Sequence, residues 1–311
     1  MTRTRYFLGF DGGATKTSGA LIDSEGNVLA EAIGGPSNFQ IIGIPQASRS
    51  IMDVARKMLR PTNLDLSNIV GIFMGLTGAG RESEQVRMKS GFEEYLRNND
   101  LLVPSIRVDT DALVALEGAF PGKAGMILIS GTGSILLAKD DTGRVERVGG
   151  WGRYVGDEGS GYAIGRAGLI AYVMECDGRG KTTKITRFVN NRFGIDSPQS
   201  LVLKIYQENF DIASVARPVL DAAEEGDEVA TGILDRAAND LLSHIQSAIK
   251  KIGSATPVAF MGSVLSHPNY LVAKLSALTT EKYPGVKIVK PERSAAVGAA
   301  LLARKFLATL K

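Results

Sequence analysis

The chain has 311 residues, of which 44% are hydrophobic and 22% are charged, and its formal net charge is +3. This length accommodates two domains, and this composition is typical of a soluble globular protein, which argues against disorder and against membrane spans. The basic residues are scattered rather than gathered with aromatic residues, so nucleic-acid binding has little support.

Cys176 is the single cysteine of the chain, and there are only two histidines. One cysteine excludes an intrachain disulfide framework, and so few soft ligands argue against a zinc site. The first apolar run, residues 6–10, is too short for the core of a signal peptide. We therefore expect a cytoplasmic protein.

The first half of the chain alternates apolar runs with glycine-rich turns and helical patterns. We predict strands at residues 6–10, 18–22, 28–32, 69–74 and 106–109. Apolar residues at helical spacing predict helices at residues 44–59, ended by Pro61, and at 87–98 and 111–120. This order of elements predicts a mixed sheet with helices on its faces.

The second half repeats this plan. We predict strands at residues 126–129, 135–139, 145–148, 258–261 and 286–289. A mostly helical stretch is expected from 161 to 252, with Gly253 ending its last helix, followed by helices at 270–283 and 294–310. The repeat predicts a small domain at residues 1–118, joined by the closing helix 294–311, and a larger domain at 119–293.

Two similar hairpins mark the two halves. In each, a strand leads into glycines mixed with hydroxyl residues, at Gly12-Gly13-Ala14-Thr15-Lys16 and at Gly131-Thr132-Gly133-Ser134. Glycine tolerates positive φ and close approach, and successive N–H groups in such turns can form an anion-binding nest. Two such turns predict a nucleotide polyphosphate held in a cleft between two domains.

Asp11 precedes the first turn, where a carboxylate can hold Mg²⁺ through water. An aspartate before two glycines is also a common turn former, so the second hairpin is what favours the functional interpretation. Thr15 and Lys16 can donate to phosphate oxygens, although Lys16 alone is typical of a solvated surface lysine.

Asp111 follows the strand at 106–109 and begins a helix, which places it at the carboxyl edge of the sheet. A carboxylate there could accept a proton during phosphoryl transfer to an alcohol, or could simply cap the helix. Asp109 is a competing carboxylate, since residues two apart share a face in an extended chain.

Five motifs occur in an order that resembles the N-acetylglucosamine kinases and the BadF/BadG/BcrA/BcrD ATPase family, within the actin/hexokinase superfamily. They are Asp11-Gly12-Gly13-Ala14-Thr15-Lys16-Thr17, Pro36-Ser37-Asn38, Thr110-Asp111-Ala112, Ile129-Ser130-Gly131-Thr132-Gly133-Ser134, and Gly149-Gly150-Trp151-Gly152 with Gly156-Asp157-Glu158-Gly159-Ser160-Gly161. The resemblance covers nearly the whole chain. It implies an α/β fold of two ribonuclease-H-like domains, each a mixed sheet flanked by helices, with ATP and Mg²⁺ as cofactors.

The resemblance also implies roles for individual residues. It selects Asp111 as the general base and Asp11 as the metal residue. It assigns ATP to Gly12, Gly13, Thr15, Lys16, Gly131, Thr132, Gly133, Ala213, Gly262 and Ser263. It assigns the sugar to Asn38, Asp111, Ser134, Gly150, Trp151, Gly152 and Asp157. A homodimer is expected by the same analogy.

The leading hypothesis is therefore an ATP-dependent kinase acting on the 6-hydroxyl of N-acetylglucosamine, glucosamine or a related hexose. An alternative is an ATPase that drives an electron-transfer partner, as activators in this family do. Those relatives hold an iron–sulfur cluster through cysteines, and one cysteine per chain cannot supply four ligands even in a dimer. A non-catalytic sugar sensor is a third class, for which no nucleic-acid-binding segment is evident. The loops around residues 36–43 and 150–162 leave the choice of sugar open.

Overall fold

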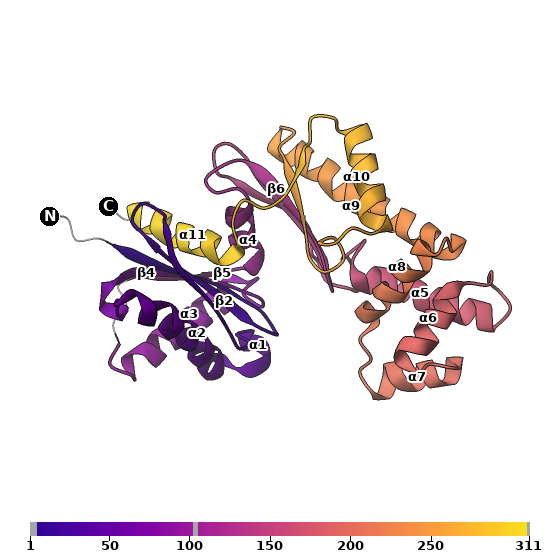
Figure 1. Ribbon diagram of the computed structural model, residues 1–311, viewed down its shortest axis with the longest axis horizontal. Helices are drawn as coiled ribbons and strands as arrows, with labels where there is room; N and C mark the ends of the chain where they lie inside the picture. The colour runs from indigo at the N-terminus through magenta and orange to yellow at the C-terminus, as the bar shows by residue number, and fades with distance from the viewer. Residues whose placement is uncertain (1–4, 102–104, 310–311) are drawn as a thin grey trace. The chain divides into compact units, whose positions relative to one another are not determined.

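The computed structural model describes residues 5–101 and 105–309. The chain divides into two compact units (Figure 1). Unit 1 comprises residues 1–123 and 291–311, and unit 2 comprises residues 124–290. The first division thus lies after Lys123 rather than after residue 118, and the closing segment is grouped with unit 1.

Unit 1 is built on a five-stranded mixed sheet with the order β3-β2-β1-β4-β5. Its strands are β1 (Tyr6–Gly12), β2 (Thr17–Asp23), β3 (Val28–Gly34), β4 (Ile69–Leu76) and β5 (Ile106–Asp109). The first three form an antiparallel meander, whereas β4 and β5 run parallel to β1. Because β1, β4 and β5 run in the same direction, their carboxyl ends lie at one edge of the sheet.

Helices cover both faces of this sheet (Figure 1). They are α1 (Phe39–Ile42), α2 (Ile44–Leu59), α3 (Glu82–Arg97), α4 (Asp111–Ala119) and α11 (Ala295–Thr309), with short 3-10 turns at Arg60–Thr62 and Leu66–Asn68. The apolar side chains of α2 and α3 pack on one face, and those of α4 and α11 pack on the other. A Cβ on Gly9 would overlap the α11 backbone at Ala300, so glycine lets this helix lie directly on β1.

Unit 2 repeats the topology of unit 1 with the order β10-β9-β6-β7-β8. Its strands are β6 (Gly125–Ser130), β7 (Ser134–Lys139), β8 (Val145–Gly149), β9 (Val258–Met261) and β10 (Ile288–Val289). Again the first three in sequence are antiparallel, and the last two join in parallel. The predicted fold class of two mixed sheets flanked by helices is confirmed.

The helices of unit 2 form the insert between β8 and β9 and the connection to β10. They are α5 (Gly161–Cys176), α6 (Lys184–Phe193), α7 (Pro198–Gln207), α8 (Ala216–Glu224), α9 (Glu228–Ile252) and α10 (Tyr270–Lys282), with a 3-10 turn at Ile212–Val215. The predicted apolar face of α9 is buried at Ile233, Ala237 and Leu241. Gly253 ends α9 with φ 72°, as predicted.

Several elements differ from their predicted bounds, most of them by one or two residues at an end. Helix α3 begins at Glu82 instead of residue 87, because its first turn is polar and shows no apolar periodicity. Pro61 lies inside a 3-10 turn that continues α2, so the chain does not leave the helical path at that point. Strand β10 is limited to Ile288–Val289. No helix in the described part of the chain is long and apolar enough to cross a membrane.

Candidate active site

The first glycine turn joins β1 to β2 in unit 1. Asp11 and Gly12 still belong to β1, where they pair with Ser18 and Thr17 of β2, and the Gly13 N–H donates to the Lys16 carbonyl at 3.0 Å. Neither Gly12 nor Gly13 has a positive φ, so this turn does not use the left-handed backbone that glycine permits. The glycine at position 12 is needed for space, since a Cβ there would overlap Ser37 Oγ.

Asp111 lies at the carboxyl edge of the same sheet, at the start of α4. Its Oδ2 accepts a 2.6 Å hydrogen bond from the Thr77 hydroxyl, and its Oδ1 accepts from the Ala112 N–H at 2.9 Å. The cap of α4 is Thr110, whose hydroxyl accepts from the Leu113 N–H. Asp111 is therefore not used as the helix cap, and its carboxylate is held by two donors.

Asp109 has different partners. Its Oδ1 accepts a 2.7 Å hydrogen bond from the Thr110 N–H, and burial raises the pKa of this carboxyl above its usual value. Asp111 rather than Asp109 is the carboxylate that acts electrostatically on Asp11. The geometry thus distinguishes two carboxylates that sequence position alone does not.

Asp11 lies in an environment that disfavours its charge. The pKa of Asp11 is raised from 3.8 to about 6, mainly by burial and then by the negative charge of Asp111, while the positive charge of Lys16 partly opposes the shift. A divalent cation would offset this unfavourable charge, so the site fits Mg²⁺. Within residues 5–101 and 105–309, no three His, Cys, Asp or Glu side chains form a metal site by themselves. A bound Mg²⁺ would therefore depend on water and phosphate oxygens as well.

Thr15 and Lys16 have exposed side chains on this turn, whereas Asn38 is buried beside it. The Asn38 N–H donates to the Gly13 carbonyl at 3.1 Å, which fixes Asn38 against the turn. Its Oδ1 accepts from the Gln40 N–H and caps α1. Unit 1 thus brings together all seven residues that the sequence predicted for it, namely Asp11, Gly12, Gly13, Thr15, Lys16, Asn38 and Asp111.

Thr77 is a member of this group that the sequence analysis did not single out. It follows β4 directly, and its N–H donates to the Gly12 carbonyl at 2.9 Å. A Cβ on Gly13 would stand 3.7 Å from Thr77 Oγ1, in ordinary contact. Thr77 could have been predicted from its position directly after a parallel strand, because the carboxyl ends of such strands meet at one edge of the sheet.

The second glycine turn joins β6 to β7 in unit 2. The Gly131 N–H donates to the Gly133 carbonyl at 2.9 Å, and neither glycine has a positive φ. The Gly131 and Thr132 carbonyls accept from the first N–H groups of α5, at Gly161 and Tyr162. The turn is therefore anchored on the amino end of α5, with the Thr132 side chain exposed.

Ser134 is buried at the start of β7, where its hydroxyl donates to the Glu158 carbonyl at 2.7 Å. Ser130 makes the equivalent contact from β6, donating to the Gly159 carbonyl at 2.9 Å. These two hydroxyls hold the segment before α5 against the glycine turn. A contact from Ser134 to the sugar remains a prediction.

A cavity of about 350 Å³ lies beside the second turn, within unit 2. Gly131, Thr132, Ala213 and Ser263 line it, so four of the predicted nucleotide residues meet at one cavity. Gly262 shapes the turn that carries Ser263, with φ 89° and no room for a Cβ against the Ser130 carbonyl. Further polar residues that were not predicted also line the cavity, among them Arg192, Arg217 and His267.

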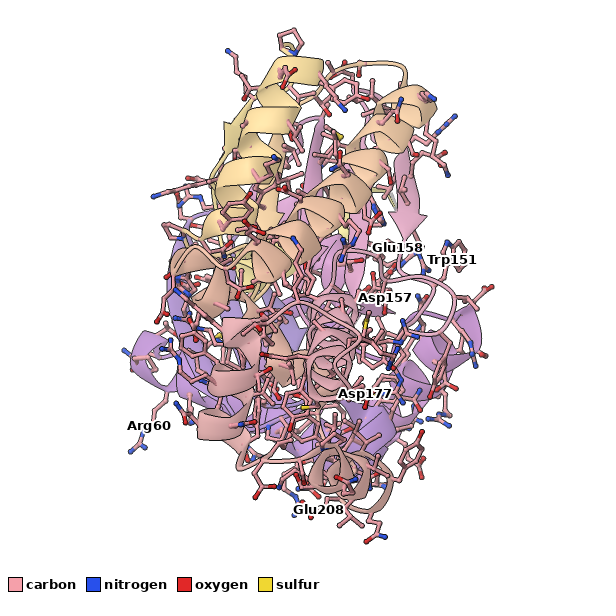
Figure 2. The ribbon with its side chains drawn as sticks, turned by 90° about the vertical axis from the view of Figure 1, so that its right-hand side faces the viewer. Arg60, Trp151, Asp157, Glu158, Asp177 and Glu208 are labelled. Atoms are coloured by element: carbon pink, nitrogen blue, oxygen red, sulfur yellow. The ribbon has the colours of Figure 1, made fainter. Side chains whose placement is uncertain are left out.

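The glycine-rich loop between β8 and α5 carries the remaining predicted residues (Figure 2). Trp151 is 68% exposed and lies under the Arg147 guanidinium, at 4.5 Å from the ring centroid. Gly150 and Gly152 on either side have φ of 73° and 90°. Arg147 also donates to the Gly149 and Gly150 carbonyls, so one side chain fixes both the backbone and the ring.

Asp157 connects this loop to the second glycine turn. It has φ 59°, a left-handed conformation that is uncommon for a residue other than glycine. Its Oδ1 accepts from the Gly152 N–H at 3.3 Å. A Cβ on Gly133 would stand 2.7 Å from its Oδ2, so the carboxylate lies against the turn.

Other glycines of the loop have a packing role. A Cβ on Gly149 would overlap the ring of His244, and one on Gly159 would overlap Leu241, both on α9. His244 is buried, with Nδ1 2.9 Å from the Asp240 carbonyl oxygen and Nε2 3.9 Å from Glu158 Oε2. The loop therefore packs on α9 at both ends, and its middle, residues 151–155, is exposed.

Comparison with known proteins gives a consistent result. The model of the BadF/BadG/BcrA/BcrD ATPase family matches residues 8–303. The N-acetylmuramic acid/N-acetylglucosamine kinase of Clostridium acetobutylicum is 31% identical over 306 residues, covering 96% of this chain and 98% of that protein. The N-acetyl-D-glucosamine kinase of Dictyostelium discoideum is 31% identical over 313 residues, covering 96% of this chain and 97% of that protein.

Solved structures agree on the fold. The crystal structure of a proposed N-acetylglucosamine kinase from Chromobacterium violaceum has a TM-score of 0.75 and 28% sequence identity, and the match covers 96% of this chain and 99% of that one. The architecture of two repeated mixed sheets is therefore that of the actin/hexokinase type.

Proposed function

Since the chain belongs to the BadF/BadG/BcrA/BcrD ATPase family, we propose that it is an ATP-dependent kinase for the 6-hydroxyl of N-acetylglucosamine, glucosamine or a related hexose. The named activities of two relatives, each matched over 96% of this chain, support a sugar kinase. The observation that carries the proposal is the carboxylate of Asp111, held by two donors at the sheet edge beside Asp11.

Asp111 would act as the general base in this reaction. Its two oxygens each accept one hydrogen bond from the protein, which leaves lone pairs for the proton of a sugar hydroxyl. A carboxylate that orients an alcohol toward the γ-phosphate and accepts its proton is what phosphoryl transfer requires of the protein.

Asp11 would hold Mg²⁺, which supplies charge neutralisation at the phosphates when bound. The Thr15 hydroxyl and the Lys16 ammonium are exposed on the same turn and would donate to phosphate oxygens. In unit 2, the Gly131-Thr132-Gly133 turn would contact phosphate through the Thr132 side chain. The adjoining cavity, with Ala213 and Ser263 in its wall, has the size and partly apolar lining that suit a nucleoside.

We assign the sugar to Asn38 in unit 1 and to the loop residues Gly150, Trp151, Gly152 and Asp157 in unit 2, with Ser134 supporting that loop. An exposed indole is a suitable platform for a sugar ring, and a carboxylate accepts hydrogen bonds from its hydroxyls. The amide of Asn38 already caps α1 through Oδ1, so its Nδ2 group would be the donor toward the sugar.

An ADP-release assay with Mg-ATP tests the proposal. The panel is N-acetylglucosamine, glucosamine, N-acetylmuramic acid, glucose, mannose and no sugar. Release that depends on one or more sugars establishes a kinase and ranks its substrates. ADP release at the same rate with and without every sugar would instead favour the energy-coupling ATPase, and it would contradict the assignment of Asn38, Trp151 and Asp157 to the sugar.

A further inference from the structure

Thr77 links three parts of the unit 1 site at the end of β4. Its N–H donates to the Gly12 carbonyl at 2.9 Å, and its hydroxyl donates to Asp111 Oδ2 at 2.6 Å. The same hydroxyl lies in contact range of Gly13, where a Cβ would be 3.7 Å away. One residue therefore joins the first glycine turn to the carboxylate at the start of α4.

This arrangement determines the orientation of the Asp111 carboxylate. The Ala112 N–H holds Oδ1 from within α4, and Thr77 holds Oδ2 from the end of β4. A planar group that accepts from two separate elements has little freedom to rotate, and a short hydrogen bond to a carboxylate is among the stronger ones in proteins. The helix cap is supplied by Thr110, so the Thr77 contact is not required to begin α4.

We infer that Thr77 is a positioning residue that orients Asp111 for proton transfer through its hydroxyl. This inference rests on the proposed function, because it assigns Thr77 a role through the proposed general base. Thr77 itself touches neither transferred atoms nor proton; it limits the directions in which the Asp111 oxygens can accept.

Thr77→Val removes the hydroxyl and keeps a similar shape. We expect kcat to fall about 10- to 100-fold, with KM for sugar and ATP within about threefold of wild type, because only the orientation of the base is lost. Thr77→Ser restores the hydroxyl and should keep kcat within about threefold of wild type.

Thr62→Val is the matched control. The Thr62 hydroxyl also donates a hydrogen bond within unit 1, to the Leu59 carbonyl at 2.8 Å, but it lies in the turn after α2 and not at the site. If Thr77 were only structural, both valine variants would lower the unfolding midpoint, and neither would lower kcat while leaving KM for sugar and ATP near wild type. That result would overturn the inference.

A double-mutant cycle with Asp111→Asn decides the question. If Thr77 acts through Asp111, Thr77→Val should lower kcat in the wild-type background and have almost no further effect in the Asp111→Asn background. Equal effects in the two backgrounds would refute the positioning role while leaving the kinase intact. A wild-type protein with no sugar-dependent ADP release would instead refute the proposed function, and this role with it. Should Thr77→Val not fold, the cycle is run with Thr77→Ala, and Thr77→Ser still tests the hydroxyl.

Discussion

Asp157 and Gly133 are in direct contact, so that a Cβ on Gly133 would stand 2.7 Å from Asp157 Oδ2. The Asp157 carboxylate, which we assign to the sugar, therefore lies against the Gly131-Thr132-Gly133 turn, which we assign to phosphate. A substitution in this turn should therefore change the position of Asp157.

Gly133→Ala should weaken sugar binding, with KM for the sugar rising about 10-fold or more, because the added methyl group displaces the Asp157 carboxylate. Gly131→Ala is the matched control in the same turn, since its Cβ would meet nothing closer than Ser263 Oγ at 3.7 Å. Steady-state kinetics with varied sugar and varied ATP measures both. Equal sugar KM values in the two variants would show that Asp157 does not depend on this contact.

Asp111→Asn should lower kcat about 10²-fold or more while leaving the affinities for ATP and sugar near wild type. The asparagine keeps the size of the side chain and an oxygen that can accept from Thr77, but it cannot take up a proton. Binding is followed by calorimetry and turnover by ADP release. Retained turnover would remove Asp111 from the role of base.

Trp151→Ala should raise KM for the sugar about 10-fold and change KM for ATP little, because the indole is 68% exposed and offers apolar ring surface to a ligand. Tyr154→Ala is the control, as Tyr154 is an aromatic residue of the same loop and is 81% exposed. The free energy of unfolding should hardly change in either variant. Equal losses of sugar and ATP affinity in Trp151→Ala would indicate a purely structural loop.

Asp11→Asn should stabilise the ligand-free protein at neutral pH and abolish activity. The pKa of Asp11 is about 6 in the folded protein and 3.8 ordinarily, so folding opposes its ionisation. Below pH 3.8, Asp11 is protonated in both the folded and the unfolded protein and does not change the free energy of unfolding. Above pH 6, it is ionised in both, and it lowers the free energy of unfolding by up to about 3 kcal/mol. The stability of wild type relative to Asp11→Asn should therefore fall as pH rises from 4 to 6.

Chemical denaturation at pH 4 and pH 7 measures this difference. Asp53→Asn is the control, because Asp53 is an exposed carboxylate of α2 whose ion pair with Arg56 should contribute less than about 1 kcal/mol. A difference between wild type and Asp11→Asn that does not depend on pH would contradict the electrostatic account of Asp11.

Most elements of the fold were predictable because their apolar residues follow a clear period. Helix α2 and strands β5 and β9 have the expected bounds, since each combines buried apolar residues with a breaker or turn beside it. The start of α3 was missed, because only Met88, Phe92 and Leu96 of this helix are buried and its first turn carries none of them. The spacing of apolar residues indicates only the buried part of a helix, so it does not predict a first turn that is exposed to solvent.

The site was less predictable, because contacts between strand ends do not appear in the sequence. Asp111 could be identified from its motif, but its partner Thr77 lies 34 residues away in a stretch that reads as a glycine turn. The glycines of both turns were predicted as positions of positive φ or of close approach, and only close approach applies: Gly12 and Gly133 are needed for space and not for positive φ. Arg192 and Arg217 look like ordinary surface residues of amphipathic helices until the cavity is seen.

Unit 1 is interrupted in the sequence by the whole of unit 2, and α11 returns to lie on β1 where Gly9 admits its backbone. During synthesis, unit 2 is complete before residues 291–311 emerge, whereas the sheet of unit 1 still lacks the helix that covers one of its faces. The order of folding on the ribosome should thus be the reverse of the order of the strands, with unit 2 native first. A released chain that is truncated after residue 290 should present a protease-resistant unit 2 and a protease-sensitive unit 1.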